Sequence, residues 1–470
     1  MLRLLLIINC TVSFLASAAA QPPQLRAGAY AQDITPQKFP ISVNGGFNDR
    51  QAVSAHDPLH ARCLVIESQG VKVALVVVDS CMIPRDILDA AKALAEKTTQ
   101  IPARNILISA THTHSAPTVA AVFQSEPDKD YVQFLTNKIA EGIDKANKRL
   151  APAKLAWGVA EEPNQVFNRR WRMKPGVKNL DPFGRDTDQV KMNPPRMSPD
   201  LLEPAGPTDP TVTVLSLRTA DDQPLAIFAN YSLHYVGDMP PLSADYFGVF
   251  ADLMGTKLQA GKDFVGMLSN GTSGDVNNIN FKAEAPKAKP GERSRVVADA
   301  VATAAMKAIN KKEHTNQATL KSATTEIELG VRKPNAQDVQ RAKAILAKAQ
   351  GRELRGAEEV YARETVLLQD YPERVRVPLQ VLQVGEAAIV AIPCETFAEI
   401  GLSLKKKSPL ATTCVVSLAN GYYGYLPTPQ QHQLGGYETW RARSSFLEVE
   451  ASTKIERAVM DLIRELRQEK

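Results

Sequence analysis

The alternation of short apolar runs with longer helical patterns constrains the fold of this chain most strongly. Runs of strand length occupy residues 61–67, 71–79, 105–110, 211–217, 225–233, 264–269, 379–384 and 387–392. Helical periodicity falls between them or after them, at 85–97, 130–148, 246–258, 293–311, 336–369 and 452–467. This order predicts an α/β domain in which helices flank a mixed, largely parallel sheet.

Three segments do not fit the alternation. The stretch 336–369 is charged almost all round, which predicts a peripheral helical hairpin inserted at about 335–372. The stretch 173–210 is rich in Pro, Asp and Lys, and 282–292 carries Ala-Pro-Lys repeats, so both are expected to be loops. We find no internal repeat of domain size and expect residues 21–470 to form one catalytic domain.

The N-terminus has the pattern of a secretory leader. Met1 and Arg3 precede an apolar run at 4–15, and the small residues 17–20 follow it. This pattern predicts a cleaved signal peptide over residues 1–20 and a secreted or periplasmic mature chain that begins near Gln21. The apolar core is shorter than the roughly 20 residues of a spanning helix, and no later stretch qualifies, so no integral membrane segment is expected.

Composition excludes several classes of protein. With 44% hydrophobic and 23% charged residues, the chain is typical of globular proteins. The net charge of +5 is spread without long basic runs or interleaved aromatic residues, which argues against nucleic acid as a partner. Four cysteines follow the leader and resemble neither a disulfide framework nor a CxxC zinc site. We expect buried thiols, with one disulfide bond as the alternative in an oxidising compartment.

Scarce polar residues follow the predicted strands. Of only seven histidines, His112 and His114 come directly after 105–110, and His234 comes after 225–233. Glu395 follows 387–392 across a Pro-Cys turn, and the Gly-rich stretch 270–275 follows 264–269. In open α/β sheets, ligands bind beyond the carboxyl ends of the strands, where loops and helix N-termini converge. The sequence therefore predicts a site at that edge.

Two histidines and a carboxylate are the ligand types of a catalytic zinc ion, which keeps one position open for water. Zinc-bound water loses its proton near neutral pH and becomes a nucleophile. A lone histidine after a strand is more often a hydrogen-bonded structural residue, so spacing alone leaves both interpretations open. The pair His112 and His114 favours the metal, because in an extended segment both rings would point to one side.

The segment 111–117, Thr-His-Thr-His-Ser-Ala-Pro, resembles the THTHSGP motif of the neutral ceramidase family, zinc amidases that cleave the N-acyl bond of ceramide. Six further segments resemble family motifs in the same order, over roughly residues 27–446: 168–169 (NRS), 230–234 (the second zinc histidine), 243–248 (SDNxG), 274–276 (GDVSPN), 393–397 (PGEFT) and 420–438 (NxYxxY to RYE). Seven short motifs in one order are far more specific than any one of them.

The resemblance implies roles residue by residue. The residues that match the zinc ligands of the family are His112, His234, Glu395 and Tyr425. His114 matches a histidine that acts on the scissile carbonyl or on water, whereas Arg169 and Tyr437 match residues that hold the substrate and the developing oxyanion. A tyrosinate ligand is unusual, but the charge of the metal favours the ionised form.

The chain departs from the family pattern at two points. Asn277 stands where the family has the serine of GDVSPN, and an amide cannot form an acyl-enzyme. Asn277 could still donate a hydrogen bond to an oxyanion, which leaves direct attack by zinc-activated water open, with Ser273 or Thr272 as replacement hydroxyls. The chain ends one helix after Tyr437, so we expect it to lack the family's C-terminal domain.

The sequence therefore predicts a secreted zinc-dependent hydrolase that acts on an N-acyl amide, ceramide-like, or on a related ester of a small-molecule or lipid-like substrate. The alternative is a secreted zinc-binding or lipid-binding protein that keeps this fold and has lost catalysis together with the serine. A purely structural exported protein is the third interpretation. It requires that the four predicted ligands do not converge.

Overall fold

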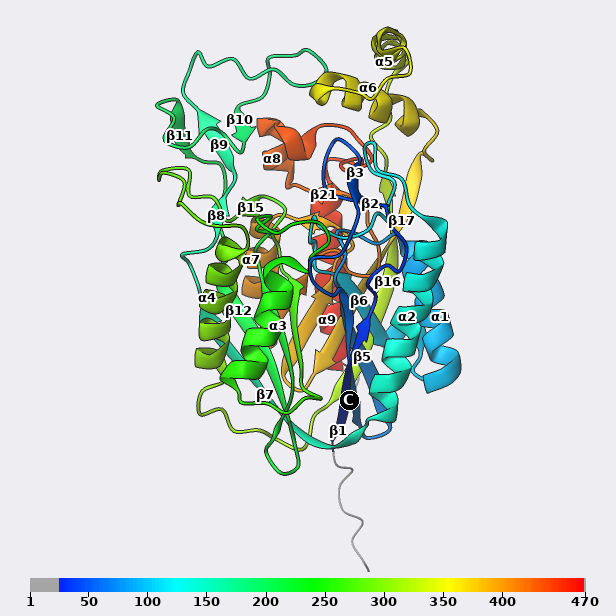
Figure 1. Cartoon of the computed structure of the whole chain (residues 1–470), viewed down its shortest axis with the longest axis vertical. Helices are drawn as coiled ribbons and strands as arrows, with labels where there is room; N and C mark the ends of the chain where they lie inside the picture. The colour runs from blue at the N-terminus through cyan, green and yellow to red at the C-terminus, as the bar shows by residue number, and fades with distance from the viewer. Residues whose placement is uncertain (1–24, 469–470) are drawn as a thin grey trace, which may run out of the picture.

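The computed structural model describes residues 25–468, so the predicted leader at 1–20 lies outside the described residues. Two β-sheets pack face to face, and helices cover the outer face of each sheet, which gives four layers (Figure 1). The described N-terminal strand and the C-terminal end lie at the lower end of the view in Figure 1, and the small sheets and short helices gather at the upper end.

The larger sheet has eight strands. Their spatial order is β14 (Val265–Asn270), β13 (Pro224–Tyr231), β12 (Thr211–Thr219), β7 (Ala151–Glu161), β1 (Arg26–Asp33), β4 (His60–Ser68), β5 (Val71–Val78) and β6 (Ile106–Ala110). Only the two outermost pairs, β13 with β14 and β5 with β6, are parallel. The mixed α/β class is confirmed, but the expectation of a largely parallel sheet is wrong for this layer.

The connections explain the strand directions. β4 and β5 are joined by Gln69 and Gly70, whose φ angles of 51° and 78° form a tight turn that only antiparallel neighbours can share. Each parallel pair instead has a helix in its crossover: α1 (Arg85–Thr99) lies between β5 and β6, and α3 (Asp245–Lys257) lies between β13 and β14. Short connections between apolar runs therefore indicate hairpins.

The smaller sheet has the order β16 (Leu320–Gly330), β17 (Arg374–Val384), β18 (Ala387–Ala391) and β20 (Thr412–Val416). Its one parallel pair, β18 with β20, again encloses a helix, α7 (Ala398–Lys407). The C-terminal helix α9 (Ala451–Gln468) packs against β16 and β17 on the outer face. On the outer face of the larger sheet, α1 and α2 (Lys129–Lys148) cover one half, and α3 and α4 (Glu292–Ile309) cover the other.

The core between the sheets accounts for the continuous apolar runs in the sequence. Leu64 on β4 faces Ile389 and its neighbours on the smaller sheet, while the adjacent Cys63 faces the helices on the other side. Strands buried on both faces lose the alternation of apolar and polar residues. The indole N–H of Trp157 donates to the carbonyl of Val384 over 2.9 Å, which ties the two sheets together.

The upper end in Figure 1 is built from short elements that carry the loops of the site. The stretch predicted as a loop at 173–210 contains strands β10 and β11, and both pair with β9. The remaining short elements are β2 (Ile41–Val43), β3 (Arg50–Ala52), η1 (Ala103–Asn105), β8 (Phe167–Asn168), β9 (Arg170–Met173), β10 (Val190–Met192), β11 (Leu201–Pro204), β15 (Val276–Asn277), β19 (Glu395–Thr396), β21 (Tyr425–Leu426), α8 (Pro429–Leu434) and η2 (Tyr437–Thr439).

The predicted helical hairpin is present as α5 (Ala336–Ala349) and α6 (Gly356–Gln369), which pack against each other at the upper end of the molecule (Figure 1). α5 is largely exposed, but α6 buries Tyr361 and Glu364. Glu364 accepts hydrogen bonds from Nε and Nη2 of Arg443, each over 2.8 Å. The hairpin is therefore held against the segment around Arg443, and the next residue, Ser444, accepts the backbone N–H of Tyr425.

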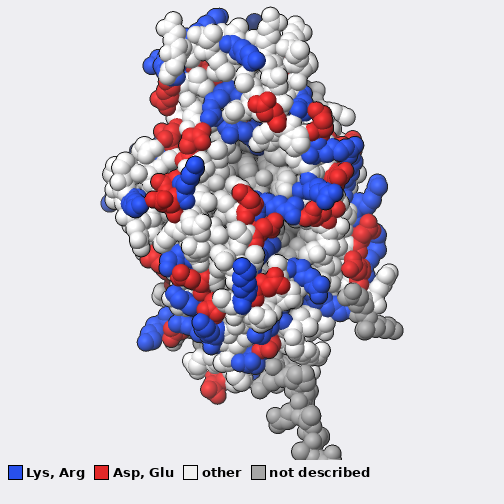
Figure 2. Space-filling model, turned by 90° about the vertical axis from the view of Figure 1, so that its right-hand side faces the viewer, with Lys and Arg blue, Asp and Glu red and all other residues white. Residues whose placement is uncertain are grey.

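Two further features concern the surface and the thiols. Acidic and basic side chains are interleaved over the face shown in Figure 2. Within residues 25–468, no helix has the length and apolarity needed to cross a membrane. The four cysteines of this part of the chain are buried free thiols, as expected.

Candidate metal centre

The four predicted ligands lie around one cavity at the upper end of the sheets. His112 follows β6, His234 follows β13, and Glu395 follows β18. Tyr425 opens β21, which pairs with β19 so that Tyr425 stands opposite Glu395. His114, Arg169 and Tyr437 line the same cavity, which has a volume of about 220 Å³. Seven of the eight predicted site residues therefore converge, which removes the ground for the purely structural interpretation.

His112 adopts a backbone conformation that is uncommon for a residue with a side chain. Its φ of 73° lies in the left-handed region, and its N–H donates to the carbonyl of Ser80 over 2.9 Å. The extended segment expected around His112 and His114 is therefore not what brings their rings together. The left-handed turn does so and leaves their Nε2 atoms 3.2 Å apart.

Each of the three histidines is held through its Nδ1 atom. His112 contacts the carbonyl of Cys81 at 2.6 Å, His114 that of Gly45 at 2.9 Å, and His234 that of Ser273 at 3.1 Å. A carbonyl oxygen can only accept, so each Nδ1 carries a proton and Nε2 is the ring nitrogen left for a metal. The Nε2 atoms of His112 and His234 are 3.0 Å apart, too close for two lone pairs without a positive charge between them.

Glu395 supplies the negative charge of this group. Its Oε1 accepts a hydrogen bond from the hydroxyl of Tyr422 over 3.0 Å. Its Oε2 is buried and has no donor within the described part of the chain, and it lies 3.2 Å from Nε2 of His112 and 4.0 Å from Nε2 of His234. In a tetrahedral site with zinc–ligand bonds of about 2.0–2.1 Å, two ligand atoms lie about 3.3 Å apart. The separations of 3.0, 3.2 and 4.0 Å among these three atoms are close to that value, so the donor set fits a zinc ion.

The pKa shifts of the three histidines are consistent with a cation at this point. Burial lowers the pKa of His112, but the carboxylate of Glu395 and the neighbouring Cys81 outweigh burial and raise it to about 10. Burial lowers the pKa values of His114 and His234 well below 6.5, and the positive charge of His112 lowers both further. One positive charge therefore belongs at the point where the three ligands meet, and a divalent ion would displace the proton from His112.

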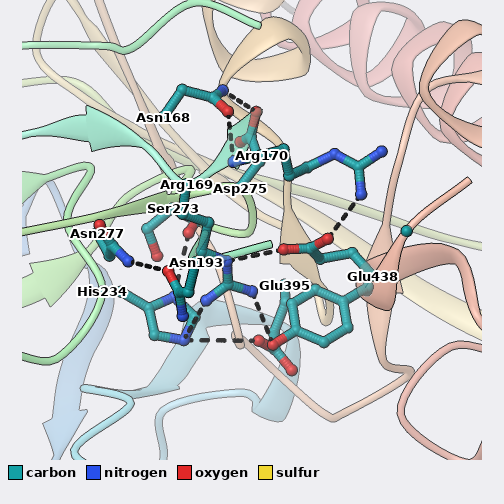
Figure 3. Close-up of polar contacts among 12 residues, drawn as sticks. Asn168, Arg169, Arg170, Asn193, His234, Ser273, Asp275, Asn277, Glu395 and Glu438 are labelled. Carbon is teal, nitrogen blue, oxygen red and sulfur yellow. Dashed lines mark hydrogen bonds and ion pairs between the residues drawn. The ribbon is translucent and has the colours of Figure 1, made fainter. Parts of the chain in front are cut away.

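A buried ion network stands behind the ligands (Figure 3). The guanidinium of Arg169 donates to Glu438 over 2.8 Å and to the hydroxyl of Tyr425 over 3.0 Å, and it lies 3.3 Å from Nε2 of His234. Arg170 donates to the other oxygen of Glu438 over 2.6 Å. Burial raises the pKa of Glu438, but Arg170 and Arg169 outweigh burial, so the pKa lies below its usual value and the carboxylate stays ionised.

The two predicted tyrosines pack with their rings 5.8 Å apart. Burial raises the pKa of Tyr425 well above 10, and the charge of Glu395 raises it further, while Arg169 lowers it. The phenol is therefore neutral until a cation binds beside it. Burial also raises the pKa of Tyr437, so its hydroxyl remains a hydrogen-bond donor.

Asn277 is the exception among the predicted residues, because it does not line the cavity. Its side-chain amide donates to Oδ1 of Asn193 over 2.6 Å, and it is Asn193 that reaches the cavity. Asn193 lies in the stretch predicted as a loop, where no sequence pattern marks it. Tyr235, which stacks on His114 at a ring distance of 3.7 Å, and Tyr422 were also missed. Tyr422 lies inside the motif at 420–425, which is the signal that could have found it.

Comparisons with known proteins identify the family of this chain. The model of the family described as neutral/alkaline non-lysosomal ceramidase, N-terminal, matches residues 26–285, which is more than half of the 470 residues. Neutral ceramidase B of Dictyostelium discoideum is 26% identical over 222 residues, which cover 45% of this chain and 28% of that protein. The match thus spans less than a third of the length of that relative.

Two solved structures are similar to the whole fold. The crystal structure of neutral ceramidase from Pseudomonas aeruginosa matches with a TM-score of 0.73 and 17% identity, over 95% of this chain and 75% of that one. A ceramidase complexed with C2 matches with a TM-score of 0.72 and 17% identity, over 95% of this chain and 76% of that one. At this identity the likeness establishes the fold alone. The family match shows that this chain belongs to the neutral/alkaline non-lysosomal ceramidase family.

Proposed function

We propose that this protein is a secreted, zinc-dependent hydrolase that cleaves an N-acyl amide bond, ceramide-like, or a related ester bond. One observation carries the proposal: the Nε2 atoms of His112 and His234 converge on a buried carboxylate oxygen of Glu395 that has no hydrogen-bond partner among the described residues. The family membership supports hydrolysis, and the signal-peptide pattern at 1–20 supports export.

The residues that would hold the zinc ion are His112, His234, Glu395 and Tyr425. When bound, zinc polarises a carbonyl group and lowers the pKa of a water molecule to about 7. The hydroxyl of Tyr425 already accepts a hydrogen bond from Arg169, and that guanidinium would stabilise the tyrosinate form.

His114 is placed to move a proton. Its Nδ1–H is held by the carbonyl of Gly45, and its Nε2 faces the cavity beside His112. Burial and the neighbouring His112 keep the pKa of His114 well below 6.5, so the ring is neutral at pH 7 and can accept a proton. In this role His114 takes a proton from the attacking water and delivers it to the leaving amine or alcohol.

Arg169 and Tyr437 are placed to stabilise negative charge. Glu438 fixes the guanidinium of Arg169 at 2.8 Å, so the cation needs no reorganisation when charge develops on the substrate. The protonated hydroxyl of Tyr437 lines the same cavity and can donate to an oxyanion.

The other wall of the cavity is apolar and suits an acyl chain. It is formed by Phe47, Met82, Val122 and Phe123. The volume of about 220 Å³ is below the roughly 300–1,000 Å³ of pockets that enclose a drug-sized ligand. We therefore propose that the cavity encloses the scissile group and the first carbons of the acyl chain, while the remainder of the substrate lies outside it.

The experiment that tests the function uses residues 21–470. Bound zinc is quantified, and hydrolysis of N-acyl sphingosines, N-acyl amino acids and simple esters is measured with chelated and zinc-reloaded protein. We expect chelator-sensitive turnover that zinc restores. His114→Ala is expected to keep its zinc and to lose turnover, whereas Tyr423→Phe, outside the cavity, keeps both.

The outcomes separate the alternatives. Stoichiometric zinc without turnover on any of these substrates would favour the secreted binding protein that has lost catalysis. The absence of zinc from the purified, reloaded protein would contradict the metal centre itself. Full turnover of zinc-loaded His114→Ala would contradict the role of His114 alone.

A further inference from the structure

A pair of asparagines, Asn193 and Asn277, forms a fixed polar contact at the edge of the cavity, beside Arg169 and His234 (Figure 3). Asn277 uses its Oδ1 to accept the backbone N–H of Ile279 over 2.9 Å. Its Nδ2 therefore points the other way, where it donates to Asn193 over 2.6 Å. The backbone contact fixes which end of the Asn277 amide is the donor.

This contact also fixes the amide of Asn193. Because Asn277 offers an N–H group, Asn193 presents its carbonyl oxygen, and the NH₂ group of Asn193 is turned away from Asn277. Within residues 25–468, no acceptor is found for that NH₂ group, and Asn193 is exposed and lines the cavity. Its two N–H donors are therefore free to meet a bound molecule.

The backbone holds Asn193 equally firmly. Its N–H donates to the carbonyl of Arg169 over 2.9 Å, and its φ of 48° is left-handed, a conformation that asparagine tolerates better than most residues. Pro194 follows, with a fixed φ of its own. A donor that is held before the ligand arrives loses little conformational freedom on binding, and each such bond then contributes more to affinity.

We propose that Asn193 is a substrate-contacting residue that recognises an uncharged oxygen, a hydroxyl or a carbonyl, on the leaving-group side of the substrate. Asn277 is then a positioning residue that orients Asn193. This inference rests on the proposed hydrolase function. An uncharged group fits best, because Arg169 is the only lysine or arginine among the described residues that line the cavity, and Glu438 already balances its charge.

The test compares two substrates that differ in one group: N-(2-hydroxyethyl)hexanamide and N-propylhexanamide, in which a methyl group replaces the hydroxyl. We expect kcat/KM of the wild-type protein to favour the hydroxyl-bearing amide by about 5- to 10-fold, the effect of one hydrogen bond. Asn193→Ala is expected to reduce this preference to about 1-fold and to keep its zinc, because kcat/KM falls much more for the hydroxyl-bearing amide than for the propyl amide. Asn277→Ala is expected to lose most of the preference.

Asn193→Leu provides a second variant of similar shape without hydrogen-bonding groups, and it should lose the preference as Asn193→Ala does. The inference is overturned if Asn193→Ala keeps the wild-type preference or slows both substrates equally. If wild-type protein hydrolyses neither short amide, the substrate panel described above still decides the proposed function, and calorimetric titration of both compounds decides the inference. Tighter binding of the hydroxyl-bearing amide by wild type than by Asn193→Ala then supports it, and equal affinities overturn it.

Discussion

At the scale of single residues, the metal centre depends on backbone carbonyls that decide which nitrogen of each histidine is bare. Cys81, Gly45 and Ser273 accept from the three Nδ1 atoms, so the three Nε2 atoms crowd together beside a carboxylate oxygen that has no hydrogen-bond partner among the described residues. Such an arrangement costs free energy in a protein without a metal. It becomes favourable only when a cation occupies the site.

Glu395→Gln tests this dependence on charge. The amide of glutamine can donate to the bare Nε2 of His112, so the variant should fold, but it lacks the negative charge that a divalent ion requires. We expect zinc affinity to fall by more than about 100-fold, since loss of an outer partner alone costs about 10- to 100-fold.

Two matched tyrosine variants serve as controls for Glu395→Gln. Tyr422→Phe removes only the hydrogen bond to Oε1 and should weaken zinc binding by about 10-fold. Tyr423→Phe, whose hydroxyl contacts the carbonyl of Arg376, should leave zinc binding unchanged. Zinc titration with a competing chelator measures all three affinities, and equal affinities of wild type and Glu395→Gln would contradict the assignment.

Glu438→Gln tests the buried network behind the ligands. Glu438 and Arg170 have fully buried side chains, and Arg169 shares the same carboxylate. Removal of the negative charge leaves two buried guanidinium groups without a counter-ion, which should reduce the free energy of unfolding by about 3–5 kcal/mol. Urea denaturation measures the loss. Asp130→Asn, which breaks the exposed pair with Lys38, should leave the midpoint unchanged.

The motifs in the sequence predicted four residues that line the cavity but not their surroundings. His112, His234, Glu395 and Tyr425 are rare residue types at strand ends, and their chemistry limits what they can do there. Asn193 and Tyr235 act through contacts with segments far away in the sequence, and an asparagine before two prolines is also an ordinary loop residue. Local patterns contain no information about such contacts.

At the scale of elements, apolar runs located the strands that are buried on both faces, and periodicity located the long helices. Four strands of the two large sheets were missed: β20 has only five residues, and β1, β7 and β16 are less uniform. β16 alternates between buried and exposed positions and carries Lys321, Glu326 and Glu328, while β7 begins with Ala-Pro-Ala-Lys. Half-exposed strands such as these resemble loops in composition. Strand direction was also missed, because it depends on connection length more than on the strand residues.

Helix α1 provides a prediction about pH. Lys92 on α1 is buried and donates to Oδ1 of Asn420 over 2.8 Å, and burial lowers its pKa from 10.5 to about 8. Below pH 8 the lysine is charged in both the folded and the unfolded state, so the full cost of burying the charge applies. As the pH rises from about 8 to 10.5, the folded state loses its proton first and this cost disappears.

The stability of the wild-type protein relative to Lys92→Met should therefore increase over this pH range. Other groups titrate identically in both proteins, so the difference in the free energy of unfolding isolates Lys92. Chemical denaturation at about pH 7.5, 9 and 10.5 measures the difference. The first value lies below the folded-state pKa of about 8, and the other two lie above it. If the difference in the free energy of unfolding stays constant or falls as the pH rises, the pKa of Lys92 is not lowered by burial, and the prediction is wrong.

At the scale of the whole molecule, the two sheets are held together by the core between them and by the site at their common end. His112 and His234 follow strands of the eight-stranded sheet, whereas Glu395 follows a strand of the four-stranded sheet and Tyr425 lies beyond its last strand. A metal ion would therefore connect the two layers. Metal removal should destabilise the whole fold and not only the loops around the site.

Thermal unfolding should show this coupling. With free zinc at about 100 times its dissociation constant, the folded state gains about 2.7 kcal/mol, which raises the melting temperature. We expect a chelator to lower the melting temperature of the wild-type protein and to have no effect on Glu395→Gln. Calorimetry in the presence and absence of chelator measures both shifts, and an equal shift in the two proteins would indicate an effect unrelated to the site.

The division of the ligands between two sheets has a consequence for how the protein matures. The region that matches the family model, residues 26–285, contains His112, Arg169 and His234 but neither Glu395 nor Tyr425. During synthesis the first two ligands leave the ribosome long before the other two, so an incomplete chain has no complete coordination sphere. We therefore expect a chain that ends before Glu395 to bind no metal ion at this site.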